Sequence, residues 1–351
     1  MNSFSVVEKL YTSLLASSKR LTGLREPRTI DVFERRSTIW PQDIVVPELG
    51  DRNPYAAFNP GAVLDGGYVE VFPRLITGYF WYTSVIGYFR VRLSELLEGV
   101  YEKPVRARIV IHPSNRLDLA GCEDPRVDKI EDKYYVLYTA LEPLADRVHA
   151  VNAVSRQGLA ILSNDLVVEE KHVIRIIDRS GSAIELPEVK DAALLHGGER
   201  LSILIRPDIR GVKACWSAPL RGYNVAAEEM KPFLLPEPWE HKVGCSTNAV
   251  EIGKREYLVA WHGVGLDMVY RTGFAVVSDE GELLAITRHY LLEPRTVQEY
   301  SGERPGVVFG CGLLRKGDML VFVGGVADTA IGVYTAELGK VLEHMVWLNK
   351  R

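Results

Sequence analysis

One motif recurs five times in the chain, and this repetition limits the possible folds more than any other feature of the sequence. Each copy has an apolar segment, a polar or glycine-containing turn and a second apolar segment, which is the pattern of a β-hairpin. The turns recur about every 55 to 65 residues, near Gly66, Glu131, Gly197, Gly253 and Lys316. A period of this length indicates a supersecondary unit that cannot bury its apolar faces alone and stacks against its neighbours.

Five stacked hairpin units, with further short strands between them, predict an all-β protein, a five-bladed β-propeller. Residues from Ser3 to about Leu21 have helical apolar spacing and predict a short N-terminal helix. We therefore expect two parts, an N-terminal helix with its lead-in over residues 1–50 and a propeller over residues 51–351. The alternative fold is a pair of β-sandwich domains. The helix either packs on the outside of the propeller or forms a subunit contact in a homo-oligomer.

The composition is that of an ordinary globular protein and argues against several classes of partner. Hydrophobic residues make up 47% and charged residues 25%, and the formal net charge is -4, so we expect no nucleic-acid partner. No apolar run reaches the roughly 18 residues that cross a bilayer, and the N-terminus does not have the pattern of a signal peptide. The four cysteines have no CxxC spacing, which predicts no metal site and no disulfide framework. We expect a reduced, cytoplasmic protein without a membrane partner.

Polar side chains stand at the open ends of the hairpins, where the residues before the first strand face those after the second. Asn59 faces Arg74, Asp124 faces Tyr138, Lys190 and Asp191 face Arg206, Ser246 and Thr247 face His262, and Gly310 faces Gly324 and Gly325. The position of Asp124 thus carries Asn, Lys, Ser or Thr, and Gly in the other copies. In a propeller these ends converge on the axial funnel, so the funnel is the predicted site.

The stretch "EDPR" from Glu123 contains our candidate general acid, Asp124. Glu123 beside it raises the cost of ionising both carboxyl groups if both face one pocket. The alternative is that Glu123 pairs with Arg126 and only orients the loop. We expect that Asp124 points into the funnel and that Arg126 braces it.

A second set of side chains is mainly cationic: Lys190, Arg206, Lys242, His262 and Tyr270. If they converge, they form a positive field that suits an anionic co-substrate, most simply phosphate. The alternatives are that the strand-end arginine pairs with a surface acid and that His262, beside Trp261, is a core histidine. Three carboxylates near this set in the sequence could supply a base instead: Glu185, Glu188 and Glu240.

Several stretches, in order from about Asn53 to Leu338, resemble glycoside hydrolase family 130, the β-mannoside phosphorylase family of five-bladed propellers. They include "FNPGAV" at Phe58, "EDPR" at Glu123, "KDAALL" at Lys190, "WHGVG" at Trp261 and "ADTAIGVYTAEL" at Ala327. Two stretches depart from the family pattern, "GCSTNAV" at Gly244 and the aromatic "GYFWYTSVIGYFRV" from Gly78 to Val91. Both departures bear on specificity for the acceptor.

The resemblance implies that Asp124 is the single catalytic acid and relays its proton through a sugar hydroxyl, while inorganic phosphate attacks the anomeric carbon with inversion. It assigns phosphate binding to Lys190, Arg206, Lys242, His262 and Tyr270. It assigns the mannosyl unit to Asn59, Arg74 and Asp328, and we add Glu123 as a substrate-binding residue.

The sequence therefore predicts an inverting, glycosyltransferase-type phosphorylase that converts a β-mannoside to mannose 1-phosphate and a shortened acceptor, with phosphate as co-substrate and no cofactor. One alternative is an inverting β-mannosidase, which needs a second carboxylate about 6.5–9.5 Å from the acid. Another is a non-catalytic propeller that binds a glycan or a protein, in which Asp124 points to solvent or side chains fill the axial pocket. The linkage and the acceptor sugar stay open.

Overall fold

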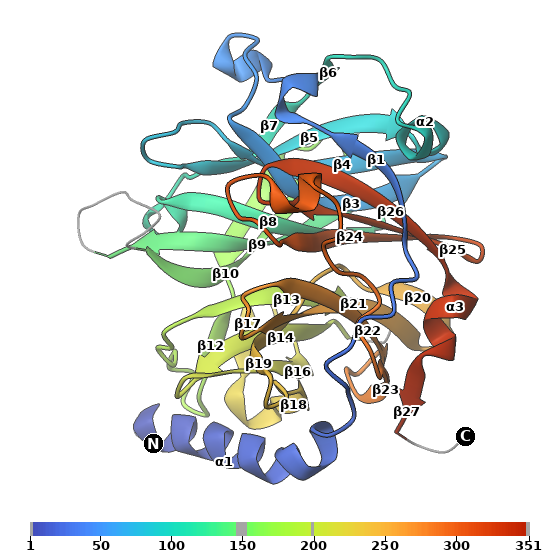
Figure 1. Ribbon diagram of the computed structural model, residues 1–351. Helices are drawn as coiled ribbons and strands as arrows, with labels where there is room; N and C mark the ends of the chain where they lie inside the picture. The colour runs from blue at the N-terminus through green and yellow to red at the C-terminus, as the bar shows by residue number, and fades with distance from the viewer. Residues whose placement is uncertain (1–2, 145–152, 198–199, 349–351) are drawn as a thin grey trace.

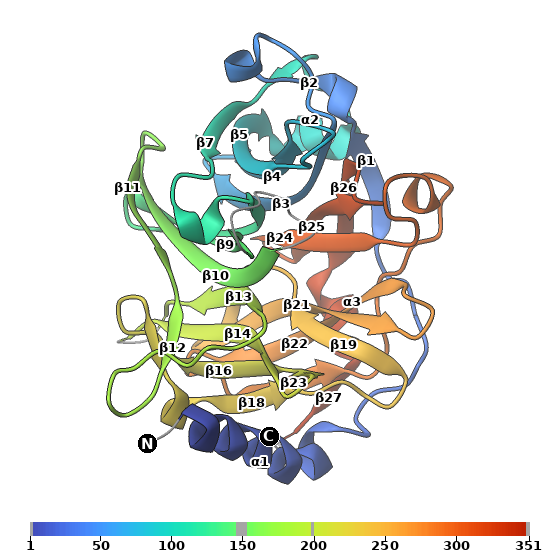
Figure 2. The same cartoon turned by 90° about the vertical axis from the view of Figure 1, so that its left-hand side faces the viewer.

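The computed structural model describes residues 3–144, 153–197 and 200–348, and the fold is a five-bladed β-propeller (Figures 1 and 2). Each blade is an antiparallel sheet whose inner strands are one of the predicted hairpins. The strands of the first two blades, from the inner to the outer edge, are β3 (Ala56–Asp65), β4 (Tyr68–Ile76), β5 (Ser84–Arg92) and β7 (Arg108–Ile111), then β8 (Gly121–Ile130), β9 (Lys133–Pro143), β10 (Ala153–Ser163) and β11 (Val168–Val173).

The third and fourth blades follow the same plan with small additions. Their strands are β13 (Val189–Leu195), β14 (Ser202–Ile209), β16 (Cys215–Pro219) and β18 (Lys231–Leu234), with β15 (Val212–Lys213) beside β14, and then β19 (Glu240–Cys245), β20 (Val250–Gly253), β21 (Glu256–Gly265), β22 (Tyr270–Ser278) and β23 (Leu283–Thr287). Both β19 and β20 pair with β21, so the inner edge of the fourth blade is interrupted.

Both ends of the chain add strands to blades that lie far away in sequence. The fifth blade contains β24 (Val308–Lys316), β25 (Met319–Val326) and β26 (Ala330–Glu337), and β1 (Glu34–Ile39) pairs with β26 as its outer strand. The last strand, β27 (Met345–Trp347), pairs with β23 of the fourth blade. These pairings tie the N-terminal lead-in and the C-terminus to the ring. The predicted division of the chain at residue 50 stays a prediction.

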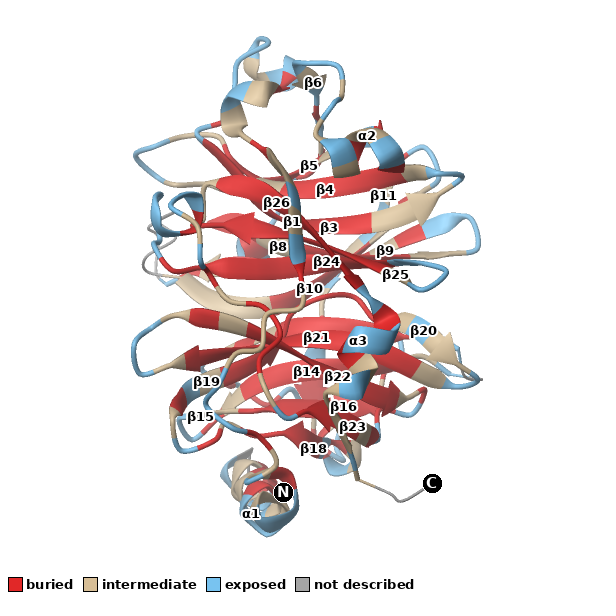
Figure 3. Cartoon of the chain, turned by 45° about the vertical axis from the view of Figure 1, so that its right-hand side comes forward, coloured by how far each residue is buried: buried red, intermediate tan, exposed pale blue. Residues whose placement is uncertain are grey.

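Buried residues lie along the strands, and exposed residues gather at the turns (Figure 3). The largest cluster of buried apolar side chains joins the second, third and fourth blades. The first seven residues of β3 and eight of the ten in β21 are buried, because blades cover both faces of these inner sheets. Two short parallel pairs lie outside the blades, β2 (Ile44–Val45) with β6 (Val105–Arg106) and β12 (Arg175–Ile177) with β17 (Asn224–Ala226).

The predicted N-terminal helix is present as α1 (Ser3–Leu21) and packs on the outside of the third blade, against β14 and β18 (Figure 1). Its buried face repeats every three to four residues, as a surface helix requires, through Val6, Leu10 and Leu14. A subunit contact through α1 stays a prediction. Two further short helices are α2 (Leu93–Glu98) and α3 (Leu338–Glu343). No helix among the described residues is long and apolar enough to cross a membrane.

The carboxyl group of Asp128, on β8, is buried away from the funnel. Asp128 is 5% exposed, and its Oδ2 has no hydrogen-bond partner among residues 3–144, 153–197 and 200–348. His196 Nε2 lies 3.9 Å from its Oδ1. Burial raises the pKa of Asp128 to about 8 and lowers the pKa of His196. The folded protein therefore holds a proton on Asp128 at pH values where the unfolded chain has lost it, so this residue destabilises the fold progressively as the pH rises from about 4 to about 8.

Asp128→Asn is expected to remove this dependence, because an amide does not ionise. The gain in the free energy of unfolding should be near zero at pH 4 and reach on the order of 1–3 kcal/mol above pH 8. Thermal midpoints at pH 5, 7 and 9 measure it, with Asp132→Asn at the exposed tip of the same hairpin as the control. A gain that is the same at all three pH values would contradict the assignment.

Candidate active site

Three inner strands have the same irregularity at their funnel ends. The pairing register of β3, β8 and β13 shifts there, and one residue in each shift has a positive φ: 45° for Asn59, 49° for Asp124 and 53° for Asp191. Asn and Asp adopt this left-handed conformation more readily than other residues with a side chain. The third-blade equivalent of Asp124 is therefore Asp191, and the prediction that it is Lys190 is wrong.

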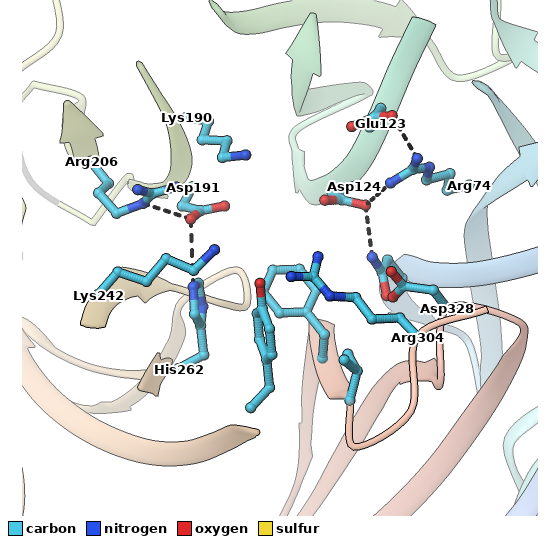
Figure 4. Close-up of a pocket in the computed structure, with 14 residues that line it drawn as sticks. Arg74, Glu123, Asp124, Lys190, Asp191, Arg206, Lys242, His262, Arg304 and Asp328 are labelled. Atoms are coloured by element: carbon cyan, nitrogen blue, oxygen red, sulfur yellow. Dashed lines mark hydrogen bonds and ion pairs between the residues drawn. The ribbon is translucent and has the colours of Figure 1, made fainter. Parts of the chain in front are cut away.

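A cavity of about 240 Å³ lies where the five blades converge (Figure 4). All ten side chains that the sequence analysis assigned to a site line it: Asn59, Arg74, Glu123, Asp124, Lys190, Arg206, Lys242, His262, Tyr270 and Asp328. Four further lining residues were not predicted as site residues: Asp191, Arg304, Val307 and Phe309. The funnel is thus an open pocket, as a catalytic propeller requires, and side chains do not fill it.

One wall of the pocket is built around the predicted acid. Asp124 Oδ1 accepts hydrogen bonds from Asn59 Nδ2 at 2.8 Å and Arg74 Nη1 at 3.2 Å, and the side chain stays 16% exposed. Any side chain at position 325 would collide with Asn59, so Gly325 is required for this approach. Arg74 Nη2 also binds Glu123 Oε1 at 2.5 Å. The guanidinium group therefore holds both neighbouring carboxylates.

Arg126 supports this wall from behind, as the sequence analysis predicted. Its Nη1 donates to the main-chain oxygen of Asp124 at 2.8 Å, and its Nε donates to the main-chain oxygen of Ser246 at 2.6 Å. Its carboxylate partner is Asp191, at 3.2 Å. The alternative in which Glu123 pairs with Arg126 is wrong, because Arg74 takes Glu123 and the register shift sends the two side chains in different directions.

Two carboxyl groups beside Asp124, those of Glu123 and Asp328, retain protons more readily than free carboxyl groups do. Burial raises the pKa of Glu123, and the charge of Asp124 adds to this while Arg74 opposes it. Burial also raises the pKa of Asp328 to about 6, again with Arg74 opposing and Asp124 adding. Crowded, buried carboxyl groups of this kind are suited to general-acid chemistry.

The opposite wall is cationic and organised by Asp191. Asp191 Oδ2 accepts from Arg206 Nε at 2.8 Å and lies 3.6 Å from His262 Nε2. A Cβ on Gly244 would approach Asp191 Oδ2 to 2.6 Å, so glycine is needed beside this pair. Burial would raise the pKa of Asp191, but the guanidinium groups of Arg206 and Arg126 hold it far below its usual range. Asp191 is therefore a fixed anion that orients its neighbours.

Several donors on this wall have no partner among the residues that the structure describes. Arg206 is fully buried, and its Nη2 makes no hydrogen bond to any of them. The structure gives Lys242 and Arg304 no ion pair with any described residue; both stack on Tyr270, with 5.1 and 5.2 Å to the ring centroid. Burial, with Lys190 and Arg206 adding, lowers the pKa of Lys242 to about 7. Unpaired cationic donors in a buried pocket are a binding site for an anion.

The two alternatives for this set, a surface ion pair of Arg206 and a core position of His262, fit the structure only in part. Arg206 is fully buried and pairs with buried Asp191 and with Glu188, whose side chain is 18% exposed. His262 is buried and hydrogen-bonded to Ser246 Oγ at 3.0 Å, but it also lines the pocket. Burial keeps the pKa of His262 well below its usual value, so the ring is neutral in the empty site.

None of the three carboxylates proposed as an alternative base lines the pocket. Glu185 is exposed and pairs with Arg156, Glu240 is buried against Arg25, and Glu188 is held by Arg206. Among the described residues, no group of three or more His, Cys, Asp or Glu side chains could hold a metal ion.

Known proteins resemble the chain over most of its length. The profile of the family described as β-1,4-mannooligosaccharide phosphorylase, glycoside hydrolase family 130, matches residues 23–346. Two relatives from Thermoanaerobacter sp. (strain X514) are a β-1,2-mannobiose phosphorylase, 29% identical over 82% of this chain and 91% of its own, and a 1,2-β-oligomannan phosphorylase, 27% identical over 81% and 90%. The structure of Listeria innocua β-1,2-mannobiose phosphorylase with β-1,2-mannobiose has the same fold, with a TM-score of 0.65, 20% identity and coverage of 93% of this chain and 97% of that one.

Proposed function

The chain belongs to glycoside hydrolase family 130, and on that premise we propose that it is an inverting phosphorylase that cleaves a β-mannoside with inorganic phosphate. The observation that carries the proposal is the division of the pocket. A hydrogen-bonded carboxyl group, Asp124, occupies one wall, and buried cationic donors without protein partners occupy the other (Figure 4). An acid and an anionic nucleophile on opposite sides of a sugar are the two requirements of phosphorolysis with inversion.

The reaction follows from placing the mannosyl ring between the walls. Arg206, Lys242 and Lys190 bind phosphate, with His262 and Tyr270 beside them. A phosphate oxygen forms a bond to the anomeric carbon from this side as the bond to the glycosidic oxygen breaks on the other. Asp124 supplies the proton that the leaving oxygen takes up, relayed through a hydroxyl of the sugar. The products are α-mannose 1-phosphate and the shortened acceptor.

The mannosyl unit would be held by the acid wall. Asn59, Arg74, Glu123 and Asp328 surround Asp124 there and offer both donors and acceptors to sugar hydroxyl groups. Arg74 has two roles there. Its charge balances the carboxylates, and its planar guanidinium group lies over the ring of Phe58, 4.7 Å from the ring centroid. It is therefore held in one orientation before the sugar binds.

A hydrolase fits the same pocket less well. An inverting hydrolase needs a base on the face of the sugar opposite the acid. The carboxylate on that wall is Asp191, and both its oxygens are already engaged by Arg206 and Arg126. Its pKa, far below the usual range, makes it a poor proton acceptor. Glu123 and Asp328 lie on the acid wall instead (Figure 4).

We propose β-1,2-mannobiose and β-1,2-oligomannan as the first substrates to test, since the two curated relatives are named for them. The family description names β-1,4-mannooligosaccharides, so the β-1,4 series is the necessary comparison. We also propose that the protein works in the cytoplasm, because its four cysteines are buried, unpaired thiols, as a reducing compartment favours.

The reverse reaction tests the proposal. With α-mannose 1-phosphate as donor and mannose as acceptor, the protein should release inorganic phosphate and build a β-linked disaccharide, because a phosphorolytic equilibrium runs in both directions. The β-anomer of mannose 1-phosphate should not react. Release of phosphate that requires no acceptor, with free mannose as the sugar product, would contradict the proposal.

The low pKa of Lys242 predicts a pH-dependent affinity for phosphate. As the pH rises through about 7, the empty site loses the charge of Lys242. Phosphate favours the charged form, so binding above this pH takes up a proton and becomes weaker. The KM for phosphate should therefore rise with pH from 6 to 9 in the wild-type protein. Phosphate itself titrates in the same range, so the matched comparison is Lys242→Arg, in which the rise should be smaller. Identical pH profiles for the two proteins would refute the role of Lys242.

A further inference from the structure

Exposed aromatic side chains gather beside the pocket, on the connection between β4 and β5. This connection, Thr77–Thr83, contains Tyr79, Phe80 and Trp81, which are 73%, 77% and 51% exposed. Tyr55 is 63% exposed, and its ring centroid lies 6.4 Å from that of Tyr79. We call Tyr55, Tyr79, Phe80 and Trp81 the aromatic rim. A contiguous exposed apolar patch on a protein surface marks an interaction site.

The rim is attached directly to the acid wall. Thr77 N donates to Thr83 O at 3.2 Å and closes the base of the loop. Arg74 stands three residues before the loop, and Ser84 follows it immediately. Arg74 Nε donates to Ser84 Oγ at 2.9 Å, and Ser84 Oγ donates to Glu123 at 3.3 Å. The loop therefore begins and ends at residues that contact the carboxylates of the site.

Tyr82 is the link between the rim and the pocket. It has a φ of 53°, which is rare for a bulky residue and marks a conformation that the surrounding structure enforces. Its side chain packs against Phe58 and Ile76, in contrast to the three exposed aromatic residues before it. Burial raises the pKa of Tyr82 to about 12, and the charges of Arg74 and Asp328 act on it as well. Tyr82 thus packs beside Phe58, whose ring also contacts Arg74 of the acid wall.

The size of the pocket leaves part of an oligosaccharide outside. Its volume of about 240 Å³ is below the range of roughly 300–1,000 Å³ that encloses a drug-sized ligand. Three or more sugars together with a phosphate exceed what it can enclose. In an in-line displacement the leaving group departs on the side opposite the nucleophile. The cationic wall belongs to the third and fourth blades, so the acceptor leaves toward the acid wall and the first blade, where the rim lies.

On the basis of the proposed function, we propose that the aromatic rim binds the acceptor part of an oligomannoside beyond the first acceptor sugar. The apolar C–H faces of pyranose rings stack on Phe80, Trp81 and Tyr79, whose flat rings offer large contact areas at small entropic cost. The preferred substrate is then an oligosaccharide of at least three sugars, and the disaccharide uses only the polar pocket.

The test compares mannobiose with mannohexaose, in the linkage that the wild-type protein cleaves. In Phe80→Ala/Trp81→Ala, kcat/KM for the hexaose should fall about tenfold or more, while that for the biose and the KM for phosphate stay within about twofold. Phe80→Tyr/Trp81→Phe should restore most of the loss. Phe4→Ala is the matched control, because Phe4 is an equally exposed aromatic side chain on α1.

A second readout separates binding from turnover. Mannohexaose is titrated calorimetrically into Asp124→Asn with and without the substitutions Phe80→Ala and Trp81→Ala. These two rim substitutions should lower the affinity for mannohexaose by the same factor by which they lower kcat/KM. Equal losses for biose and hexaose, or no loss for either, overturn the inference. The inference is also overturned if the rim variant changes its oligomeric state and loses equal activity on both sugars, because that result identifies the rim as a subunit contact. If the wild-type protein forms no mannose 1-phosphate from mannosides of any chain length, both the proposed function and this inference are wrong. If it forms mannose 1-phosphate and the rim variant keeps the wild-type preference for chain length, only this inference is wrong.

Discussion

Asp124→Asn is expected to lower kcat/KM for phosphorolysis of a natural β-mannoside by about 10³-fold, which is within the range of general-acid contributions. The amide oxygen of asparagine can still accept the hydrogen bonds of Asn59 and Arg74, so the wall keeps its shape. The variant lacks the proton that the leaving oxygen needs. Steady-state assays of mannose 1-phosphate release measure the loss, and Asp132→Asn on the same hairpin serves as the control.

The leaving group distinguishes proton donation from a merely structural role of Asp124. An aryl mannoside with an acidic phenol leaves without protonation, so Asp124→Asn should lose far less activity on it than on mannobiose. Equal losses on both substrates would mean that Asp124 acts through the shape of the site. Unaltered turnover of mannobiose would mean that the acid lies elsewhere.

Arg206→Ala is expected to raise the KM for phosphate by about 10²-fold or more. Removing one member of a buried, charged hydrogen-bonded set costs about 2–5 kcal/mol, which corresponds to roughly 30- to 4,000-fold in affinity. Besides binding phosphate, the guanidinium group balances Asp191, so its loss leaves a buried carboxylate close to the anion. Initial rates over a range of phosphate concentrations measure the effect.

Two variants keep this test interpretable. Arg206→Lys retains the charge without the planar fork and should fall between wild type and Arg206→Ala. Arg210→Ala removes an exposed arginine from the turn after the same strand and should leave the KM for phosphate unchanged. The KM for the mannoside should change little in any of them. A parallel rise in both KM values would place Arg206 in the support of the whole pocket and outside the phosphate site.

The hairpins and the pocket could be predicted from local patterns in the sequence. Apolar segments and turn residues predicted the inner two strands of each blade. Polar residues at or near the hairpin ends predicted most of the ten pocket residues, and the family resemblance added Asp328. The outer strand of the fifth blade could not be found in this way. The segment of β1 has six residues and a partner near the other end of the chain, so no local signal identifies the pairing.

The two charged residues that sequence reasoning missed show a similar limit. Asp191 follows Lys190 directly in the sequence. The register shift and the positive φ at Asp191 decide which of these two side chains takes the position equivalent to Asp124. The enrichment of Asp and Asn in that conformation was the available signal. Arg304 lies in the connection between β23 and β24, far from any hairpin end. Its place in the pocket depends on how that loop packs, which a repeat pattern does not encode.

Phosphorolysis is tested most directly by the number of mannose 1-phosphate molecules formed for each glycosidic bond cleaved, measured by NMR with and without phosphate. We expect one α-mannose 1-phosphate per bond in phosphate and no cleavage without it, because the cationic wall binds the nucleophile and no described carboxylate on that wall is free to activate water. Free mannose formed at the same rate with and without phosphate would contradict it.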